Sequence, residues 1–219
     1  MAAFGNYTPG TINVKIRTPQ GVQQIDITDF GPYPIYSSAT VAVGQTSEIA
    51  YFQYASGGTK PGASGTATKI DTNLRQASQL DPSGEMLIYS MRIEVTTSQG
   101  GSAAPTVSSC TLGDMNLLIA KTYSSLQIST EKPLSEGPLT FFPAGGGISG
   151  TTTQNAAEAW TNGVPQSISS RVFAAPHYLP PLTNFRVVQE FLPNGFVTNL
   201  SATRDLRVVL DGLRRRASQ

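Results

Sequence analysis

The chain has 219 residues, with 15 basic and 14 acidic side chains and a formal net charge of +1. Charged residues make up 13% of it, against about 25% in an average soluble domain. One Cys cannot form an internal disulfide, and one Cys with one His cannot supply the usual zinc ligands. The net charge gives no global reason to bind nucleic acid. Every apolar run is shorter than the ~18 residues of a membrane-spanning helix, so no such helix is expected.

The N-terminal part predicts a β-hairpin. Ile12, Val14 and Ile16 alternate with polar residues, which is typical of a half-buried strand. Pro19-Gln20-Gly21 predicts a turn, and residues 22–27 resume the alternation. Further strands are expected near residues 41–43 and over 49–54.

The middle of the chain predicts a loop, a crossing segment and a long strand. Residues 56–68 are rich in Gly, Ser and Thr and contain no large apolar side chain, so a loop is expected. Residues 71–80 carry Leu at helical spacing after two candidate N-caps, which suits a short helix or an irregular crossing. Residues 86–95 predict the longest strand. Its apolar phase changes at Ser90, which predicts a β-bulge.

Between residues 100 and 160 the signals are weaker. Residues 100–105 predict a loop, and the pattern over 114–120 does not distinguish strand from helix. Strands are expected around 126–128 and over 139–142, and one helical turn over 156–160.

The C-terminal part has the clearest alternation. Residues 185–191 and 206–210 each predict a strand, and Pro193-Asn194-Gly195 predicts a turn between them. About eight short strands with little helix favour an all-β sandwich or barrel.

Few side chains suggest catalysis. A hydrolase would need His177 as its base, yet no Gly-x-Ser-x-Gly segment is present to hold a serine. The alternative is a loop histidine beside Tyr178. Cys110 has no cationic neighbour in sequence and is expected to be a small buried hydrophobe. No carboxylate pair stands out, so we expect no enzyme activity, metal or cofactor.

The C-terminus is the one region with an uneven charge. It holds five arginines, of which Arg214, Arg215 and Arg216 are consecutive, and two aspartates. These three arginines could contact phosphates of nucleic acid or anionic lipid. They could equally form a solvated end that keeps an edge strand from pairing.

Several segments together resemble the coat proteins of tailless, icosahedral double-stranded DNA phages, including phages with an internal membrane. The segments are 71–80 followed by 84–93, Phe141-Phe142-Pro143-Ala144-Gly145-Gly146-Gly147, and the ending over 206–215. They cover about a third of the chain. The resemblance implies a jelly roll. Because a jelly roll has about eight strands, 219 residues are marginal for two of them, and a single jelly roll is expected.

The resulting hypothesis is a non-enzymatic coat subunit that assembles into a virion shell. It is one domain over 1–219, with an N-terminal arm over 1–10 and a basic C-terminal tail over 212–219. Its partners would be copies of itself and other capsid proteins, with lipid or DNA at the C-terminus and no small-molecule substrate. The loops expected to meet neighbouring subunits contain Gly57, Gly58, Pro61, Phe142, Pro143, Gly145 and Gly146.

One alternative remains beside the coat subunit. A virion spike or carbohydrate-binding jelly roll would use Trp160 and neighbouring aromatic side chains as a stacking platform.

Overall fold

The computed structural model describes residues 13–18, 21–96, 111–129, 133–145, 149–152, 158–161, 172–191 and 200–215. Within these ranges the chain is mainly antiparallel β-sheet, with one α-helix, α1 (Leu112–Lys121), and one 3₁₀ turn, η1 (Leu139–Phe141). The all-β prediction is confirmed. No helix in these ranges is long and apolar enough to cross a membrane.

The first sheet is built around the last strand of the chain. Strand β13 (Arg204–Arg215) pairs with β6 (Met86–Thr96) on one side and with β4 (Ile35–Val41) on the other. The short strand β3 (Phe30–Pro32) continues the line of β4 along the end of β13. Strand β11 (Val172–Leu179) pairs with the far side of β6.

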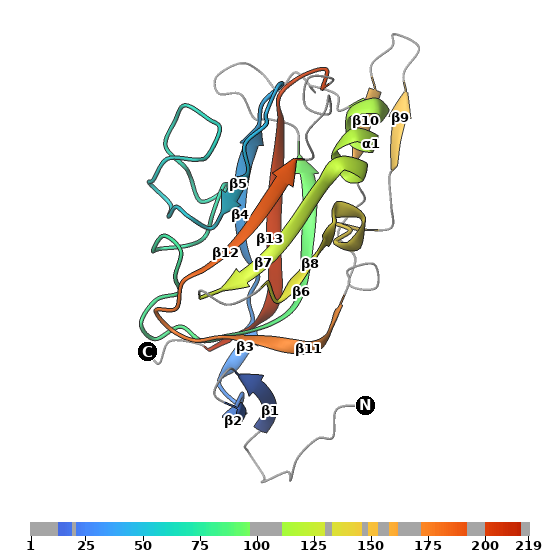
Figure 1. The fold of residues 1–219 in the computed structure, drawn as a ribbon. Coiled ribbons are helices and arrows are strands. Elements are labelled where there is room, and N and C mark those ends of the chain that lie inside the picture. The colour runs from blue at the N-terminus through green and yellow to red at the C-terminus, as the bar shows by residue number, and fades with distance from the viewer. Residues whose placement is uncertain are drawn as a thin grey trace.

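The second sheet faces the first across the main core (Figure 1). Its order is β5 (Ile49–Tyr51), β12 (Phe185–Phe191), β7 (Thr122–Ile128) and β8 (Ser135–Pro138), all antiparallel. Both sheets contribute buried apolar side chains, among them Ile93 and Val208 from the first and Tyr51, Leu126 and Val187 from the second. The structure is therefore a two-sheet sandwich.

The predicted N-terminal hairpin is confirmed. Strand β1 (Asn13–Thr18) pairs antiparallel with β2 (Gly21–Asp26), and the hairpin projects beyond one end of the sandwich (Figure 1). A second, smaller core lies here, where Ile16 and Ile25 pack with Leu87 of β6. The hairpin therefore covers outward-facing side chains of the first sheet.

The predicted bulge in β6 is also confirmed. Ser90 pairs with Asp211 while Ile88 pairs with Gly212, so Tyr89 is one extra residue on β6. Met86 and Ile88 face the main core before the bulge, and Met91 faces it afterwards. Because side chains alternate across a strand, an unbulged β6 would turn one half of these residues outward.

Several local predictions were wrong or undecided. Residues 139–142 form η1 and a turn rather than a strand, because Phe142 turns inward: its ring is fully buried and its carbonyl accepts from the Ile93 N–H (3.1 Å). Residues 158–161 form strand β10 (Glu158–Thr161), paired with β9 (Ser149–Thr152), rather than a helical turn. The undecided segment 114–120 is helical. Residues 71–80 are an irregular crossing segment.

A buried ion pair ties α1 to the start of β13. Thr111 caps the helix by accepting from the Asp114 N–H (3.1 Å). The carboxylate of Asp114 accepts from Arg204 Nε (2.9 Å) and from the Ser201 N–H (2.8 Å). Burial acts to raise the pKa of Asp114, but these hydrogen bonds outweigh burial and lower it. The Asp114 carboxylate, which like the Arg204 side chain is 2% exposed, therefore stays charged inside the protein.

Gly212 is the position where β13 passes the bulge, and we predict that Gly212→Ala destabilises the protein. A Cβ at Gly212 would lie 2.0 Å from the Leu87 carbonyl oxygen. Since that atom is backbone, the strands must separate, at a cost of about 1–3 kcal/mol. Urea denaturation measures the loss. The control is Gly113→Ala in α1, where a Cβ meets nothing closer than 3.7 Å. Equal stability of the two variants would contradict the prediction.

Candidate functional site

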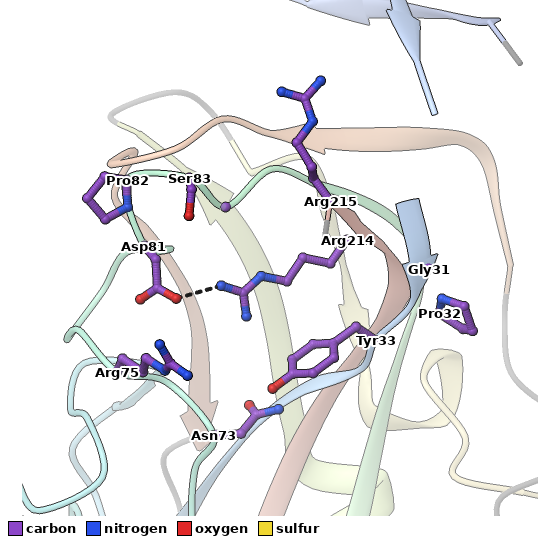
Figure 2. Close-up of a pocket in the computed structure, with 11 residues that line it drawn as sticks. Gly31, Pro32, Tyr33, Asn73, Arg75, Asp81, Pro82, Ser83, Arg214 and Arg215 are labelled. Atoms are coloured by element: carbon purple, nitrogen blue, oxygen red, sulfur yellow. Dashed lines mark hydrogen bonds and ion pairs between the residues drawn. The ribbon is translucent and has the colours of Figure 1, made fainter. Parts of the chain in front are cut away.

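A cleft of about 550 Å³ opens at the end of the first sheet, next to the N-terminal hairpin. Its walls come from β3 and the residue after it, from the crossing segment together with residues 81–84 that lead into β6, and from the end of β13. The lining residues are Gly31, Pro32, Tyr33, Asn73, Arg75, Asp81, Pro82, Ser83, Gly84, Arg214 and Arg215. Figure 2 shows the charged side chains of Arg75, Asp81 and Arg214 meeting inside it.

The alternation along β13 places Arg214 in this cleft. Leu206, Val208 and Leu210 face the main core, and two further steps of two residues bring Arg214 to the same face. The core ends before Arg214, so its guanidinium meets Asp81 (2.8 Å) rather than apolar side chains. Its Cζ also lies 5.1 Å from the centre of the Tyr33 ring, which adds a cation–π contact.

Arg215 lies on the opposite face of β13. It pairs with Glu85 (2.6 Å) and lies over the Phe30 ring (5.5 Å). Figure 2 shows its guanidinium directed away from the cleft. Glu85 also accepts from the Tyr178 hydroxyl (3.2 Å), and burial together with the charge of Glu85 raises the pKa of Tyr178 to about 12.

The predicted basic tail over 212–219 therefore needs a correction. Residues 212–215 are part of β13, paired with β6 and β3, and do not follow the strand as a separate tail. Arg214 and Arg215 point in different directions, and each pairs with an acid of its own chain. Arg216 lies outside the described residues.

Arg75 is the cleft residue that sequence reasoning missed. It lies in the crossing segment, is exposed, and directs its guanidinium into the cleft (Figure 2). No hydrogen bond or ion pair joins it to another residue in the part of the chain that the structure describes. A lone arginine in a polar stretch has no periodicity or motif to single it out, so only the folded arrangement identifies it.

The crossing segment also covers the outer edge of β4. Three backbone N–H groups of β4 that do not face β13 are satisfied by this segment and by the loop that precedes it. Tyr36 donates to the Asn73 side chain (3.1 Å), Ser38 to the Asp71 carbonyl (2.8 Å), and Thr40 to the Pro61 carbonyl (3.0 Å). An edge strand whose N–H groups are bonded in this way is not available to pair with another chain.

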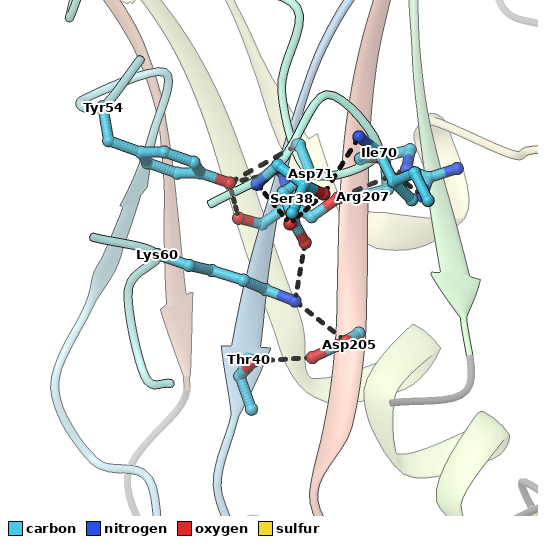
Figure 3. A network of polar contacts seen from close by, with 9 residues as sticks. Ser38, Thr40, Tyr54, Lys60, Ile70, Asp71, Asp205 and Arg207 are labelled. Atoms are coloured by element: carbon cyan, nitrogen blue, oxygen red, sulfur yellow. Dashed lines mark hydrogen bonds and ion pairs between the residues drawn. The ribbon is translucent and has the colours of Figure 1, made fainter. Parts of the chain in front are cut away.

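Lys60 fastens this segment to the sheet (Figure 3). Its ammonium lies 2.9 Å from a carboxylate oxygen of Asp205 on β13 and 3.2 Å from one of Asp71. Burial acts to lower the pKa of Lys60, but the two carboxylates outweigh burial and raise it. Burial also acts to raise the pKa of Asp71, while hydrogen bonds from Thr68 and the charge of Lys60 lower it. Lys60 and Asp71 are therefore both charged at neutral pH.

The residues expected at subunit interfaces have different environments. Gly57 is exposed with φ +94°, while Gly58 and Pro61 are half-buried. Pro143 is half-buried, whereas Phe142 and Gly145 are buried and Gly146 lies outside the described residues. The ring of Phe142 is thus a core group rather than a surface for a neighbour. The adjacent Phe141 is 45% exposed.

The remaining residues that the sequence suggested for catalysis or binding do not form a site with one another in the described part of the chain. His177 is in β11, where its ring packs against Phe173 with 4.7 Å between ring centres, and burial lowers its pKa. Cys110 lies outside the described residues, and Trp160 belongs to β10. Among the described residues, no three His, Cys, Asp or Glu side chains gather closely enough to hold a metal ion.

Comparisons with models of protein families, with curated proteins and with solved structures give no match to this chain.

We predict that Lys60→Met destabilises the protein, because it leaves Asp71 and Asp205 without their shared cation. Breaking a buried ion pair costs about 3–5 kcal/mol, and the partial exposure of these groups makes the lower figure the better expectation. The matched control is Lys69→Met, which removes the same charge from an exposed position nearby in the sequence. Urea denaturation at pH 7 should separate the two variants, and equal stability would contradict the role of Lys60.

The stability difference between the wild-type protein and Lys60→Met is expected to depend on pH. The pKa of Asp71 in the folded protein lies below its ordinary value of 3.8. Its contribution is therefore present above pH 3.8 and is lost as the pH falls through the folded pKa. The pKa of Lys60 lies above its ordinary 10.5, so its contribution is lost only as the pH rises beyond that value. The stability difference between wild type and Lys60→Met should shrink below pH 3.8.

Proposed function

We propose that the sandwich is a single jelly roll. Its eight strands, in chain order, are β4, β5, β6, β7, β8, β11, β12 and β13. They pair first with last and so on inward: β4 with β13, β5 with β12, β6 with β11, and β7 with β8. Nested pairs of this kind arise when one long antiparallel hairpin rolls into two sheets, which is the jelly-roll arrangement. The additional pairs β6–β13 and β7–β12 complete the sheets.

We infer that the protein is a coat subunit that assembles into an icosahedral phage shell. The nested strand pairing is the observation that supports it, because viral capsids are among the proteins built on jelly rolls. Fold alone does not determine function, so the sequence resemblance adds the second argument. Two of the resembling segments, 71–80 and 206–215, meet at the same cleft through Arg75 and Arg214.

The open strand edges suit contacts between copies. Within the described residues, β8 and β11 each pair on one side only, whereas the edge of β4 is covered. Val172 at the start of β11 is 61% exposed, and Leu134 beside β8 is 37% exposed. Apolar side chains next to an open edge favour association by strand pairing or packing. We propose that subunits meet along the edges of β8 and β11.

The coat function predicts concentration-dependent assembly. The purified chain should form particles, seen by sedimentation velocity and electron microscopy as the concentration rises. Val172→Glu should reduce assembly while leaving the melting temperature unchanged, because it adds charge to an exposed edge. Val43→Glu is the control, since Val43 is exposed in the turn after β4. A chain that stays monomeric at high concentration and is absent from particles would overturn the proposal.

A carbohydrate-binding module is the second candidate, and one observation favours it. A separate pocket of about 480 Å³ is lined by Gln53, Ser78, Gln127, Ser129, Asn184, Phe185 and Arg186. Amides and hydroxyls of this kind suit the hydroxyl groups of a sugar. Ser78 and Ser129 both have positive φ, at 66° and 61°, a backbone conformation that carries strain and is enriched at functional sites.

The sugar pocket predicts binding that depends on Arg186. Glycan-array binding should be lost in Arg186→Ala, whose side chain lines the pocket and bonds Gln127 (2.8 Å). The control is Lys69→Ala, which is exposed and does not line the pocket. A blank array for the wild-type protein would remove this candidate.

A further inference from the structure

We propose that the cleft beside β3 binds a compact phosphate group between Arg75 and Arg214. The proposal goes beyond a coat function and does not depend on whether the chain assembles. The ligand would be free phosphate or the phosphate of a lipid headgroup, which present the same chemistry to the two arginines.

The charge balance of the cleft is the first argument. Arg75 and Arg214 bring two positive charges into it, and Asp81 brings one negative charge. The charge of Arg215 is balanced by Glu85 on the opposite face of β13. Asp81 pairs with Arg214, and Arg75 is left with no ionic partner in the described part of the chain. An anion that lies between the two guanidinium groups would supply the missing negative charge.

The second argument is that one arginine is already held in place. Arg214 lies on a strand, pairs with Asp81, and contacts the Tyr33 ring. Its Nη2 atom also lies 3.0 Å from where a Cβ of Gly84 would be. The side chain is 17% exposed, so little conformational entropy remains to be lost on binding.

The arrangement of donors favours phosphate over carboxylate. A carboxylate is satisfied by one planar guanidinium in a two-point contact, whereas a tetrahedral phosphate accepts from several directions. The donors here come from three segments: Arg75 from the crossing segment, Arg214 from β13, and the Tyr33 hydroxyl from the residue after β3. Figure 2 shows these three groups around the same opening.

The shape of the cleft argues against a nucleic-acid strand. A polyanion is bound by a row of cations that neutralises successive phosphates. Here the cations that remain available converge on one concave site, and Arg215 is directed elsewhere. The cleft therefore suits a single phosphate better than a backbone.

The test is titration of the ¹⁵N-labelled protein with inorganic phosphate at low ionic strength, followed by NMR. Shifts should appear at residues 73–75, 81–84 and 214. Arg75→Gln should weaken binding about tenfold, as expected for the loss of a charged hydrogen bond. Because Arg75 is exposed and has no hydrogen-bond or ionic partner among the described residues, this variant should fold normally. Arg214→Gln should weaken binding similarly, and Asp81→Asn should strengthen it by removing the competing carboxylate.

Lys69→Gln is the control, since it removes one positive charge from an exposed position that does not line the cleft and should leave phosphate binding unchanged. Flotation with vesicles of phosphatidylcholine, with and without phosphatidic acid, distinguishes a lipid headgroup from free phosphate as the ligand. Binding to phosphatidic acid vesicles that Arg75→Gln weakens would identify a lipid headgroup. Phosphate binding without vesicle binding would identify free phosphate. Equal losses in Arg75→Gln and Lys69→Gln, no phosphate shifts, or binding only to duplex DNA would overturn the proposal.

Discussion

The step in register at Tyr89 is the constraint on which the rest of the structure depends. Strand β6 contributes to two cores, one between the sheets and one beneath the N-terminal hairpin. A strand with strict alternation could not keep Met86, Ile88 and Met91 on the same face. The extra residue solves this, and the closeness of Gly212 to the Leu87 carbonyl allows β13 to stay in register across the step. The position of Arg214 in the cleft follows from that register.

The few charges of this chain hold its segments together rather than solvate its surface. Ion pairs connect parts of the chain that are far apart in sequence. They join Arg204 to Asp114, Lys60 to Asp71 and Asp205, Arg92 to Asp211, Arg214 to Asp81, and Arg215 to Glu85. Most of these side chains are less than one third exposed, where screening by salt is weaker than at an open surface. A low content of charged residues is therefore compatible with a strong dependence of the fold on individual pairs.

Alternation along the strands made much of the fold predictable. The alternation of apolar and polar side chains at every second residue predicts the N-terminal hairpin, the long strand β6 with its bulge, and strands β12 and β13. The segment 139–142 misled because three apolar residues suggest a strand, whereas Phe142 turns into the core and ends the regular backbone. The sequence pointed to Arg214 through its charged neighbours. Arg75 could not be found, because its role depends on a crossing segment whose path no local pattern determines.

The pairing of β4 with β13 also has a consequence for the synthesis of the protein. Ile35 must meet Leu210, so the central strand of the first sheet is synthesised long after its partner β4. Until then, the edges of β4 and β6 that β13 will occupy have no partner. At about 5–20 residues per second, the nascent chain remains in this state for many seconds. Sheets closed by such distant contacts also fold slowly, in about milliseconds to seconds. The crossing segment, made soon after β4, can cover one edge of that strand during this interval.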